Sequence, residues 1–278
     1  MRKIGVAEKL LLGCIDEFEG VCFELLQENC AYDAIITGLD TKITKKMWEN
    51  YGSPTILSPT TNISYIPEEL WERVIKIDPS EILGVSATAE HAFCLLLMAC
   101  RKMGNHVLLT REDWLGRQLA GMNIAIFGYG RIGKLLEKYC NAFSMNIKSF
   151  DKENNNKDKI ALFNWADAIF VSITYDKTTE CFFNMSHIND FKENQIIINT
   201  SRAQIIEKQL LLNCIDRGIW NYVCLDFINY EDRPYYFDPE FIRRRDKMII
   251  TPHIAGNTKD SLKIAINIVI KKFLKRKK

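Results

Sequence analysis

Three polar residues in the C-terminal half of the chain carry groups that together suit proton transfer beside a bound anion. Arg202 lies in Asn-Thr-Ser-Arg, Glu231 follows Asp226 by five residues, and His253 lies in Thr-Pro-His. Histidine suits proton exchange because its pKa is about 6.5, and a neighbouring carboxylate orients the ring and favours the imidazolium. A guanidinium holds a carboxylate and polarises a carbonyl. The set suits reversible hydride transfer at a 2-oxo or 2-hydroxy carbon beside a bound dinucleotide.

Each of these residues also has a purely structural interpretation. Arg202 suits a salt bridge at a helix start, His253 suits a hydrogen-bonded loop histidine, and Glu231 suits a surface acid beside Asp232 and Arg233. For any one residue alone the structural interpretation is favoured. The combination, in this order and after a dinucleotide motif, favours catalysis.

The dinucleotide motif is Gly128-Tyr-Gly130-Arg131-Ile132-Gly133, which directly follows an apolar strand pattern at 123–127 and opens a helix pattern. The first glycine permits a tight turn, the second lets a pyrophosphate approach the backbone, and the third lets helix and strand pack closely. The helix N-terminus offers unpaired N–H groups to the phosphates.

Asp151 ends the next predicted strand, 23 residues after Gly128. A carboxylate there accepts hydrogen bonds from both ribose hydroxyls and repels a 2′-phosphate, which favours NAD over NADP. The alternative is a glycine-rich turn followed by an exposed acid. The order of strand, glycines, helix, strand and acid favours the nucleotide site.

Short apolar runs alternate with longer helical patterns along the chain. Strands are predicted at 3–7, 33–37, 55–58, 73–77, 123–127, 146–150, 168–173, 195–199, 222–226 and 247–250. Long helices are predicted over about 87–102, where apolar residues nearly encircle the helix, and from about 259 to the end, while 153–159 reads as a polar loop. This alternation predicts α/β architecture with parallel sheets covered by helices on both faces.

Composition excludes several other classes. Lys plus Arg is 37 and Asp plus Glu is 35, so the charge of +2 gives no electrostatic case for nucleic acid or a membrane surface as partner. The nine cysteines are widely spaced without a Cys-x-x-Cys pair, which argues against a disulfide framework or zinc site and for the cytoplasm. A lipoprotein signal ending at Cys14 is disfavoured because Glu8 and Lys9 interrupt its apolar region. We therefore expect a cytoplasmic protein without a metal.

Several segments resemble the successive motifs of the D-isomer-specific 2-hydroxyacid dehydrogenases. They are SATAEHAFCLLLMACRK, DWLGRQLAG, GYGRIG, INTSRAQIIEKQLL, CLDFINYED and TPHIAGNT. The resemblance covers about residue 55 to the end. It implies that Arg202 binds and polarises the substrate, that His253 is the acid/base and that Glu231 is its partner. It also implies that Asp226 contacts the nicotinamide amide and that Thr200 and Ser201 line the NAD pocket.

The segment from Ser58 to Ser64 resembles the family's substrate-carboxylate loop. The main-chain N–H groups of Asn62 and Ile63 would face the anion, with Thr61 beside them as a further substrate residue, and a plain turn rich in Ser, Thr and Asn is the equal alternative. Asn62 stands where the family commonly has glycine. Ala203-Gln204 and Ser172-Ile-Thr174 also depart from the pattern, and the N-terminal part is shorter than usual, which leaves the choice of substrate open.

We expect two Rossmann-like or flavodoxin-like domains, with the active site in the interdomain cleft. Residues 1–84 and 258–278 form the expected substrate domain, and 85–257 form the NAD-binding domain. The resemblance implies a homodimer through the nucleotide domain. The first alternative is a catalytically weak NAD(H)-sensing protein on the same fold, motivated by the shortened first domain and altered loops. The second is another class of Rossmann enzyme, for which no residue provides the extra acid/base groups.

Overall fold

The computed structural model describes the whole chain except residues 39, 40, 42, 62, 64, 83–85, 104–109, 113, 114, 155, 228, 231, 232, 235–237, 277 and 278. The chain forms two compact units. The first contains Met1–Val85 and Asn257–Lys278, and the second contains Ser86–Gly256. None of the described helices combines the length and apolar character needed to cross a membrane.

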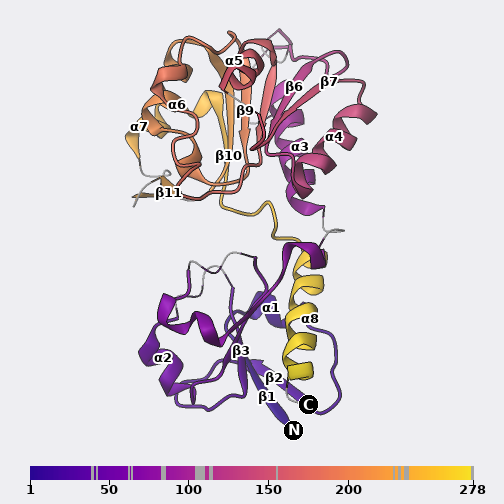
Figure 1. Cartoon of the computed structure of the whole chain (residues 1–278), viewed down its shortest axis with the longest axis vertical. Coiled ribbons are helices and arrows are strands. Elements are labelled where there is room, and N and C mark those ends of the chain that lie inside the picture. Colours follow the sequence, from indigo (N-terminus) through magenta and orange to yellow (C-terminus); the bar gives the residue numbers. More distant parts are fainter. Residues whose placement is uncertain are drawn as a thin grey trace. The chain divides into compact units, whose positions relative to one another are not determined.

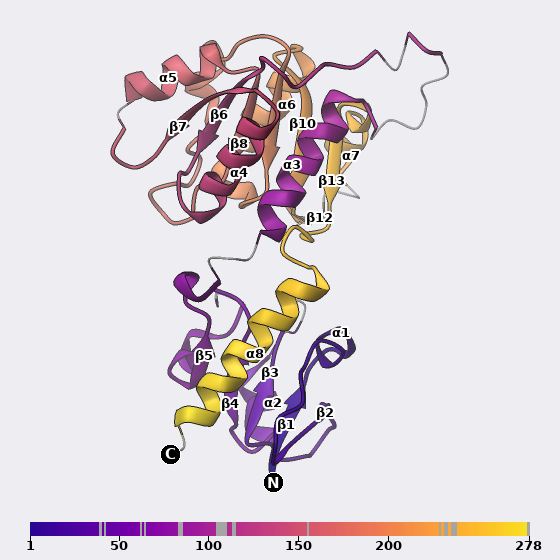
Figure 2. The ribbon, with the colours of Figure 1, turned by 90° about the vertical axis from the view of Figure 1, so that its right-hand side faces the viewer.

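The first unit is built on a five-stranded parallel sheet in the order β2-β1-β3-β4-β5. Its strands are β1 (Arg2–Val6), β2 (Val21–Leu25), β3 (Ala34–Ile36), β4 (Thr55–Ser58) and β5 (Val74–Lys76). Its helices are α1 (Lys9–Leu12), α2 (Lys45–Asn50) and α8 (Lys259–Arg276), with 3-10 turns η1 (Glu68–Arg73) and η2 (Pro79–Ile82). Apolar residues of α1 and α8 pack on one face, where Ile266 and Ile270 are fully buried, and α8 lies along the sheet (Figure 1 and Figure 2). Tyr51 and Leu70 pack on the other face.

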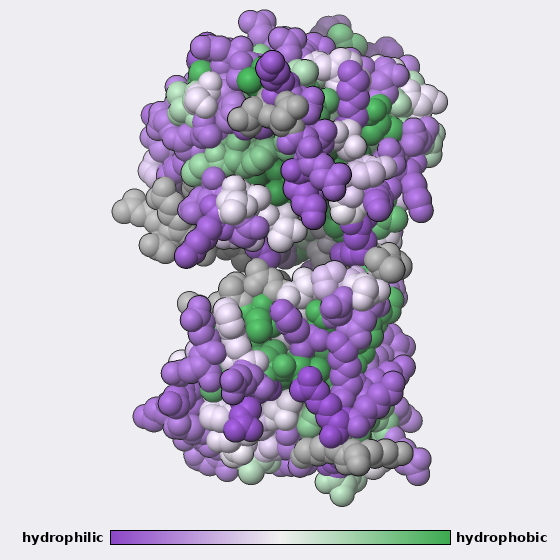
Figure 3. Space-filling view, in the orientation of Figure 1, coloured by the Kyte–Doolittle hydropathy of each residue, from purple (hydrophilic) through white to green (hydrophobic). Residues whose placement is uncertain are grey.

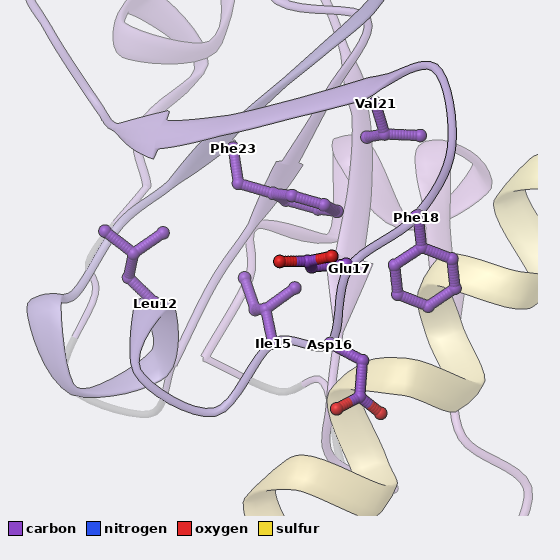
Figure 4. A pocket seen from close by; sticks show the side chains of 7 residues that line it. All are labelled: Leu12, Ile15, Asp16, Glu17, Phe18, Val21 and Phe23. Carbon is purple, nitrogen blue, oxygen red and sulfur yellow. The ribbon is translucent and has the colours of Figure 1, made fainter.

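An open pocket of ≈ 370 Å³ lies beside α1 and β2 of the first unit. Figure 4 shows its mainly apolar lining, with the Glu17 carboxylate near the Phe23 ring. The lining residues are Leu12, Ile15, Asp16, Glu17, Phe18, Val21 and Phe23, and none of them is a predicted site residue.

The second unit is built on a six-stranded parallel sheet in the order β13-β10-β9-β8-β6-β7. Its strands are β6 (Asn123–Phe127), β7 (Asn146–Phe150), β8 (Ala168–Val171), β9 (Gln195–Asn199), β10 (Trp220–Asp226) and β13 (Met248–Thr251), and the short strands β11 (Asn229–Tyr230) and β12 (Arg233–Pro234) form an antiparallel pair. Its helices are α3 (Ala87–Cys100), α4 (Arg131–Ala142), α5 (Asn156–Trp165), α6 (Lys208–Asp216) and α7 (Pro239–Ile242), with 3-10 turns η3 (Met185–His187), η4 (Ala203–Ile205) and η6 (Arg245–Lys247).

Helices cover both faces of this sheet, as the alternating pattern predicts. Helices α3 and α4 share one apolar cluster with the sheet, and α5 and α6 share the cluster on the opposite face (Figure 1). The strand order reverses beside β6, because β7 lies on one side of β6 and β8 lies on the other. In open α/β sheets ligands bind at the carboxyl edge next to such a reversal. The two parallel α/β folds confirm the predicted fold class.

Two local predictions are wrong. The predicted strands do not include β2, because its sequence VCFEL places a glutamate in a short strand at the edge of the sheet, next to β1. The stretch 153–159, read as a polar loop, already contains the start of α5 at Asn156. Its polar residues form the first turn of a helix whose Leu162 and Phe163 reach the core.

The visible surface of each unit is mainly hydrophilic, with apolar residues in small groups (Figure 3).

Candidate active site

The predicted nucleotide and catalytic residues of the second unit follow strands that end at one edge of the sheet. The register aligns Phe150, Phe127, Val171, Asn199 and Leu225 in a row across β7, β6, β8, β9 and β10. Strand β13 pairs with β10, and the last pair of residues between these two strands is Asp226 and Thr251. Parallel strands have their carboxyl ends on the same side, so the loops after them converge. Those loops carry Gly128, Asp151, Ser172, Thr200, Arg202 and His253.

The glycine turn after β6 has the geometry that its sequence predicts. Gly128 has φ +96°, a conformation that L side chains rarely adopt, and its N–H donates to the Phe150 carbonyl at 2.8 Å. A Cβ at Gly128 would lie 2.6 Å from the main chain of Ser172. A Cβ at Gly133 would lie 2.2 Å from the Gly128 carbonyl oxygen. Both positions therefore need glycine so that the strand, the turn and α4 can pack.

Gly130 has a different environment. A Cβ built there meets no described atom within 4 Å apart from its own neighbours in the chain. Gly130 is the N-cap of α4 and supplies no side-chain cap, so the first N–H groups of the helix have no acceptor within the helix itself. Partial burial lowers the pKa of Arg131, which remains a cation. This open space beside a helix N-terminus has the chemistry of an anion site.

Asp151 follows β7 and is exposed. Its Oδ1 accepts from the Lys152 N–H at 2.8 Å, and its own N–H donates to Asn154 Oδ1 at 2.8 Å. These two bonds fix the turn at the strand end. Oδ2 has no protein partner in the described part of the chain, so it can accept from a ribose hydroxyl.

The loop after β9 is held by Asn199, whose side chain is fully buried. Its Oδ1 accepts from the Ser201 N–H at 2.9 Å, and its Nδ2 donates to the Arg202 carbonyl at 2.9 Å. The Ser201 hydroxyl donates to the Ile173 carbonyl, which ties this loop to the one after β8. Thr200 lies between Asn199 and Ser201 and is partly buried.

Arg202 is a partly buried cation at this edge. Burial lowers the pKa of its guanidinium, and the negative charge of Asp226 opposes that shift. Its Nη1 donates to the Ser201 carbonyl at 2.8 Å. Arg202 follows β9, and Asp226 ends the neighbouring strand β10, so the two charged groups lie at the same edge of the sheet. A guanidinium keeps its proton there and can face an anion.

The loop after β13 is held by Asp226, which is only 1% exposed. Its Oδ1 accepts from the Thr251 hydroxyl at 2.6 Å and from the Ile254 N–H at 2.8 Å, and its Oδ2 accepts from the Ala255 N–H at 2.8 Å. His253 lies between these anchors with φ +57°. Such a backbone costs on the order of 1–3 kcal/mol in a non-glycine residue. The three bonds to one carboxylate hold the histidine in that conformation.

Two polar side chains at this edge were not assigned a role from the sequence. Ser172 donates its hydroxyl to the carbonyls of Gly128 at 2.8 Å and Phe127 at 3.2 Å, and so braces the glycine turn. His91 of α3 lies 3.0 Å from Thr251 Oγ1. Ser172 is identifiable only as a departure from the family pattern. The contact of His91 spans 160 residues, and no local pattern indicates it.

The remaining predicted site residues lie elsewhere. Glu231 and Asn62 lie outside the described residues. Thr61 is exposed and Ile63 partly buried, both in the loop after β4 of the first unit. The start of this loop is fixed by the buried Ser58, whose Oγ lies 2.9 Å from Thr60 Oγ1 and 2.8 Å from the Tyr65 hydroxyl. Among the described residues, no group of three or more His, Cys, Asp or Glu could hold a metal ion.

Comparison with known proteins identifies the family. The model of the D-isomer specific 2-hydroxyacid dehydrogenase NAD-binding domain matches residues 93–255, more than half of the chain. The chain belongs to the D-isomer specific 2-hydroxyacid dehydrogenase family. A curated relative, glyoxylate reductase from Pyrococcus furiosus, is 24% identical in an alignment that covers 90% of this chain and 81% of that protein.

Solved structures share the fold over the whole chain. D-2-hydroxyisocaproate dehydrogenase has a TM-score of 0.82 at 20% identity and covers 99% of this chain and 96% of its own. D-lactate dehydrogenase from Aquifex aeolicus, solved with NAD and lactic acid, has a TM-score of 0.70 at 20% identity and covers 98% of this chain and 95% of its own. At these identities the likeness establishes the fold.

The second unit fits NAD on its own geometry. The uncrowded Gly130, the N-terminus of α4 and the carboxylate of Asp151 lie at the carboxyl edge beside the strand reversal. The pyrophosphate would lie over Gly130 and the adenosine ribose beside Asp151. The enzyme is thus an NAD-dependent oxidoreductase acting on the 2-hydroxy acid class.

Proposed function

We propose that this enzyme interconverts a 2-oxo acid and a D-2-hydroxy acid, with His253 as the acid/base, Glu231 as its partner and Arg202 as the group that binds and polarises the substrate. The proposal rests on two buried side chains at the ends of neighbouring strands. We call each of them a clamp, because its hydrogen bonds hold the main chain of one loop in place. Asn199 holds the loop of Arg202, and Asp226 holds the loop of His253. A buried clamp on each loop restricts the two functional side chains to one edge, as catalysis requires.

The residues have the following parts in the reduction of the 2-oxo acid. NADH, when bound, would supply the hydride that C2 accepts. The electrons of the carbonyl double bond move to oxygen, and the imidazolium of His253 donates its proton there. The guanidinium of Arg202 stabilises the negative charge that develops on this oxygen. In the reverse direction neutral His253 accepts the hydroxyl proton, and Glu231 favours the imidazolium that results.

Other residues bind rather than react. We assign the cofactor to Gly128, Gly130, Arg131, Ile132, Gly133 and Asp151, with Thr200, Ser201 and Asp226 at its nicotinamide end. Asp226 Oδ2 accepts one described hydrogen bond, so it retains capacity for an amide donor. We assign the carboxylate of the substrate to the main-chain N–H groups of Thr61, Asn62 and Ile63.

The substitution His253→Ala tests the assignment of the acid/base. We expect kcat to fall by about a hundredfold or more, because general acid catalysis contributes roughly 10²–10⁴. The dissociation constant of NADH, measured by fluorescence quenching, should change little, since the glycine turn is intact. The matched control is Ile254→Ala, which removes a side chain that is 38% exposed in the same loop. A His253→Ala enzyme with wild-type turnover would refute the assignment.

We further propose that the protein is a cytoplasmic homodimer. All nine cysteines are free, and five of them are buried, as suits a reducing compartment. The dimer rests on the family resemblance, and light scattering of the purified protein tests it: a mass of one chain at micromolar concentration would exclude it.

A further inference from the structure

We infer that His91 is a positioning residue for the acid/base, acting through Thr251 and Asp226; the inference rests on the proposed function of His253. His91 lies in the second turn of α3, a region with no predicted chemistry. Its Nε2 is 3.0 Å from Thr251 Oγ1 and 3.8 Å from Asp226 Oδ1. The imidazole thus contacts the group that holds the His253 loop.

The hydrogen-bond directions in this contact follow from proton counting. A threonine hydroxyl has one proton, and an ionised carboxylate only accepts. The 2.6 Å contact between Thr251 Oγ1 and Asp226 Oδ1 takes that proton, and the Leu225 carbonyl at 3.4 Å is a weaker alternative. Toward His91 the Thr251 oxygen therefore acts as an acceptor. His91 Nε2 must carry a proton, and the relay runs from His91 through Thr251 to Asp226.

The relay sets the orientation of a carboxylate that already accepts three described hydrogen bonds. Oδ1 of Asp226 already accepts from Thr251 and from the Ile254 N–H, and Oδ2 accepts from the Ala255 N–H. Rotation of the carboxylate would break the bonds on both sides of His253. Because His253 has φ +57°, its backbone depends on these flanking bonds. Without the donor from His91, the Thr251 hydroxyl is free to turn away from Asp226.

Helix α3 gives His91 a rigid base. Leu95 and Leu96, in the next turn, are buried in the apolar cluster that covers one face of the sheet. The Cys224 thiol of β10 lies 3.6 Å from the Leu95 carbonyl. Through His91, the loop of His253 is therefore connected to a helix that is packed in the core. A role in packing alone would need only the volume of the ring, whereas positioning needs its N–H.

Three variants separate these roles. His91→Leu keeps an apolar volume and removes the donor, His91→Gln returns an N–H close to the place of Nε2, and Cys94→Ser is a matched control at an exposed position of α3. Amide hydrogen exchange at Ile254 and Ala255, measured by NMR, reports the clamp directly and without turnover. The amides of β6 report global stability.

We expect His91→Leu to accelerate exchange at Ile254 and Ala255 by about tenfold or more, the effect of one lost buried hydrogen bond. Exchange in β6 should change much less. The kcat should fall by a similar factor. His91→Gln should restore both exchange and kcat to near the wild-type values. Thr251→Val should reproduce His91→Leu, and the double variant should add little, because both break one relay.

The outcomes separate this inference from the proposed function. Unchanged exchange at Ile254 and Ala255 in His91→Leu overturns the inference, whatever the turnover. Equal acceleration in β6, or failure of His91→Gln to restore protection, also overturns it, since packing would then be the role of His91. If exchange responds as expected but the wild-type protein turns over no 2-oxo acid, the relay stands and the proposed function falls.

Discussion

Two glycines of the dinucleotide turn have different predicted roles, one in folding and one in cofactor binding. The substitutions Gly133→Ala and Gly130→Ala, which each add one methyl group, test these roles separately. In Gly133→Ala the new methyl group lies 2.2 Å from the main-chain oxygen of Gly128, far inside the separation that real Cβ atoms keep. Main chain cannot swing aside like a flexible side chain. We expect the free energy of unfolding to fall by about 1–3 kcal/mol, the usual cost of overpacking.

Gly130→Ala adds the same methyl group where no described atom outside its chain neighbours lies within 4 Å. Alanine is a poorer N-cap than glycine, but it also lowers the entropy of the unfolded chain. These effects oppose each other, so we expect the free energy of unfolding to stay within about 1 kcal/mol of wild type.

The effect of Gly130→Ala on NADH should be much larger. A phosphate oxygen must come within about 2.9 Å of an N–H nitrogen of the first turn of α4, and the methyl group stands in that approach. A hydrogen bond to a charged group contributes about 1.5–3 kcal/mol. The loss of one such bond predicts a Kd weaker by about ten- to a hundredfold.

Urea unfolding and fluorescence titration with NADH measure the two effects on the same samples. The reasoning requires opposite patterns: Gly133→Ala loses stability, and Gly130→Ala loses affinity. Wild-type affinity in Gly130→Ala would mean that the pyrophosphate does not pass over this residue. A large loss of stability in Gly130→Ala would mean that the space above it is not open.

Two further predictions concern buried polar groups. Asp226→Asn places an amide NH₂ against the N–H groups of Ile254 or Ala255, so the free energy of unfolding should fall by about 1–3 kcal/mol in urea; an unchanged midpoint would contradict the clamp. His187 is 8% exposed, its neutral Nδ1 accepts from the Asn184 N–H, and burial lowers its pKa below 6.5. Below pH about 6.5 the unfolded chain therefore binds more protons than the folded chain. The contribution of His187 to the free energy of unfolding is complete above this pH and is lost as the pH decreases below it. The urea midpoint of His187→Gln should therefore fall less between pH 8 and pH 5.5 than that of wild type, and an equal fall would contradict this assignment.

The sequence predicts the parts of the site that depend on local chain geometry. The turn at 128–133 follows from the glycine spacing after an apolar strand, and the structure has φ +96° and close packing where these are expected. The common edge of Arg202, Asp226 and His253 follows from parallel topology, since each residue comes at or just after the end of a strand. Local order therefore suffices to identify the edge.

Contacts between distant segments are what the sequence does not predict. Helix α3 is apolar around most of its circumference, so its periodicity does not show that His91 faces β13. Ser172 has the same difficulty, because its bond to Gly128 depends on the pairing of β6 and β8. Strand β2 was missed since an edge strand can expose polar side chains. The roles of Glu231 and of residues 61–63 stay predictions.

Turnover by the wild-type protein tests the central claim most directly. The measurement is NADH oxidation at 340 nm with glyoxylate and a series of larger 2-oxo acids, followed by chiral analysis of any chiral product. We predict NADH consumption with at least one acid of the panel and a product of D configuration. Tight binding of NADH without oxidation across the whole panel would contradict the account and favour a dinucleotide sensor.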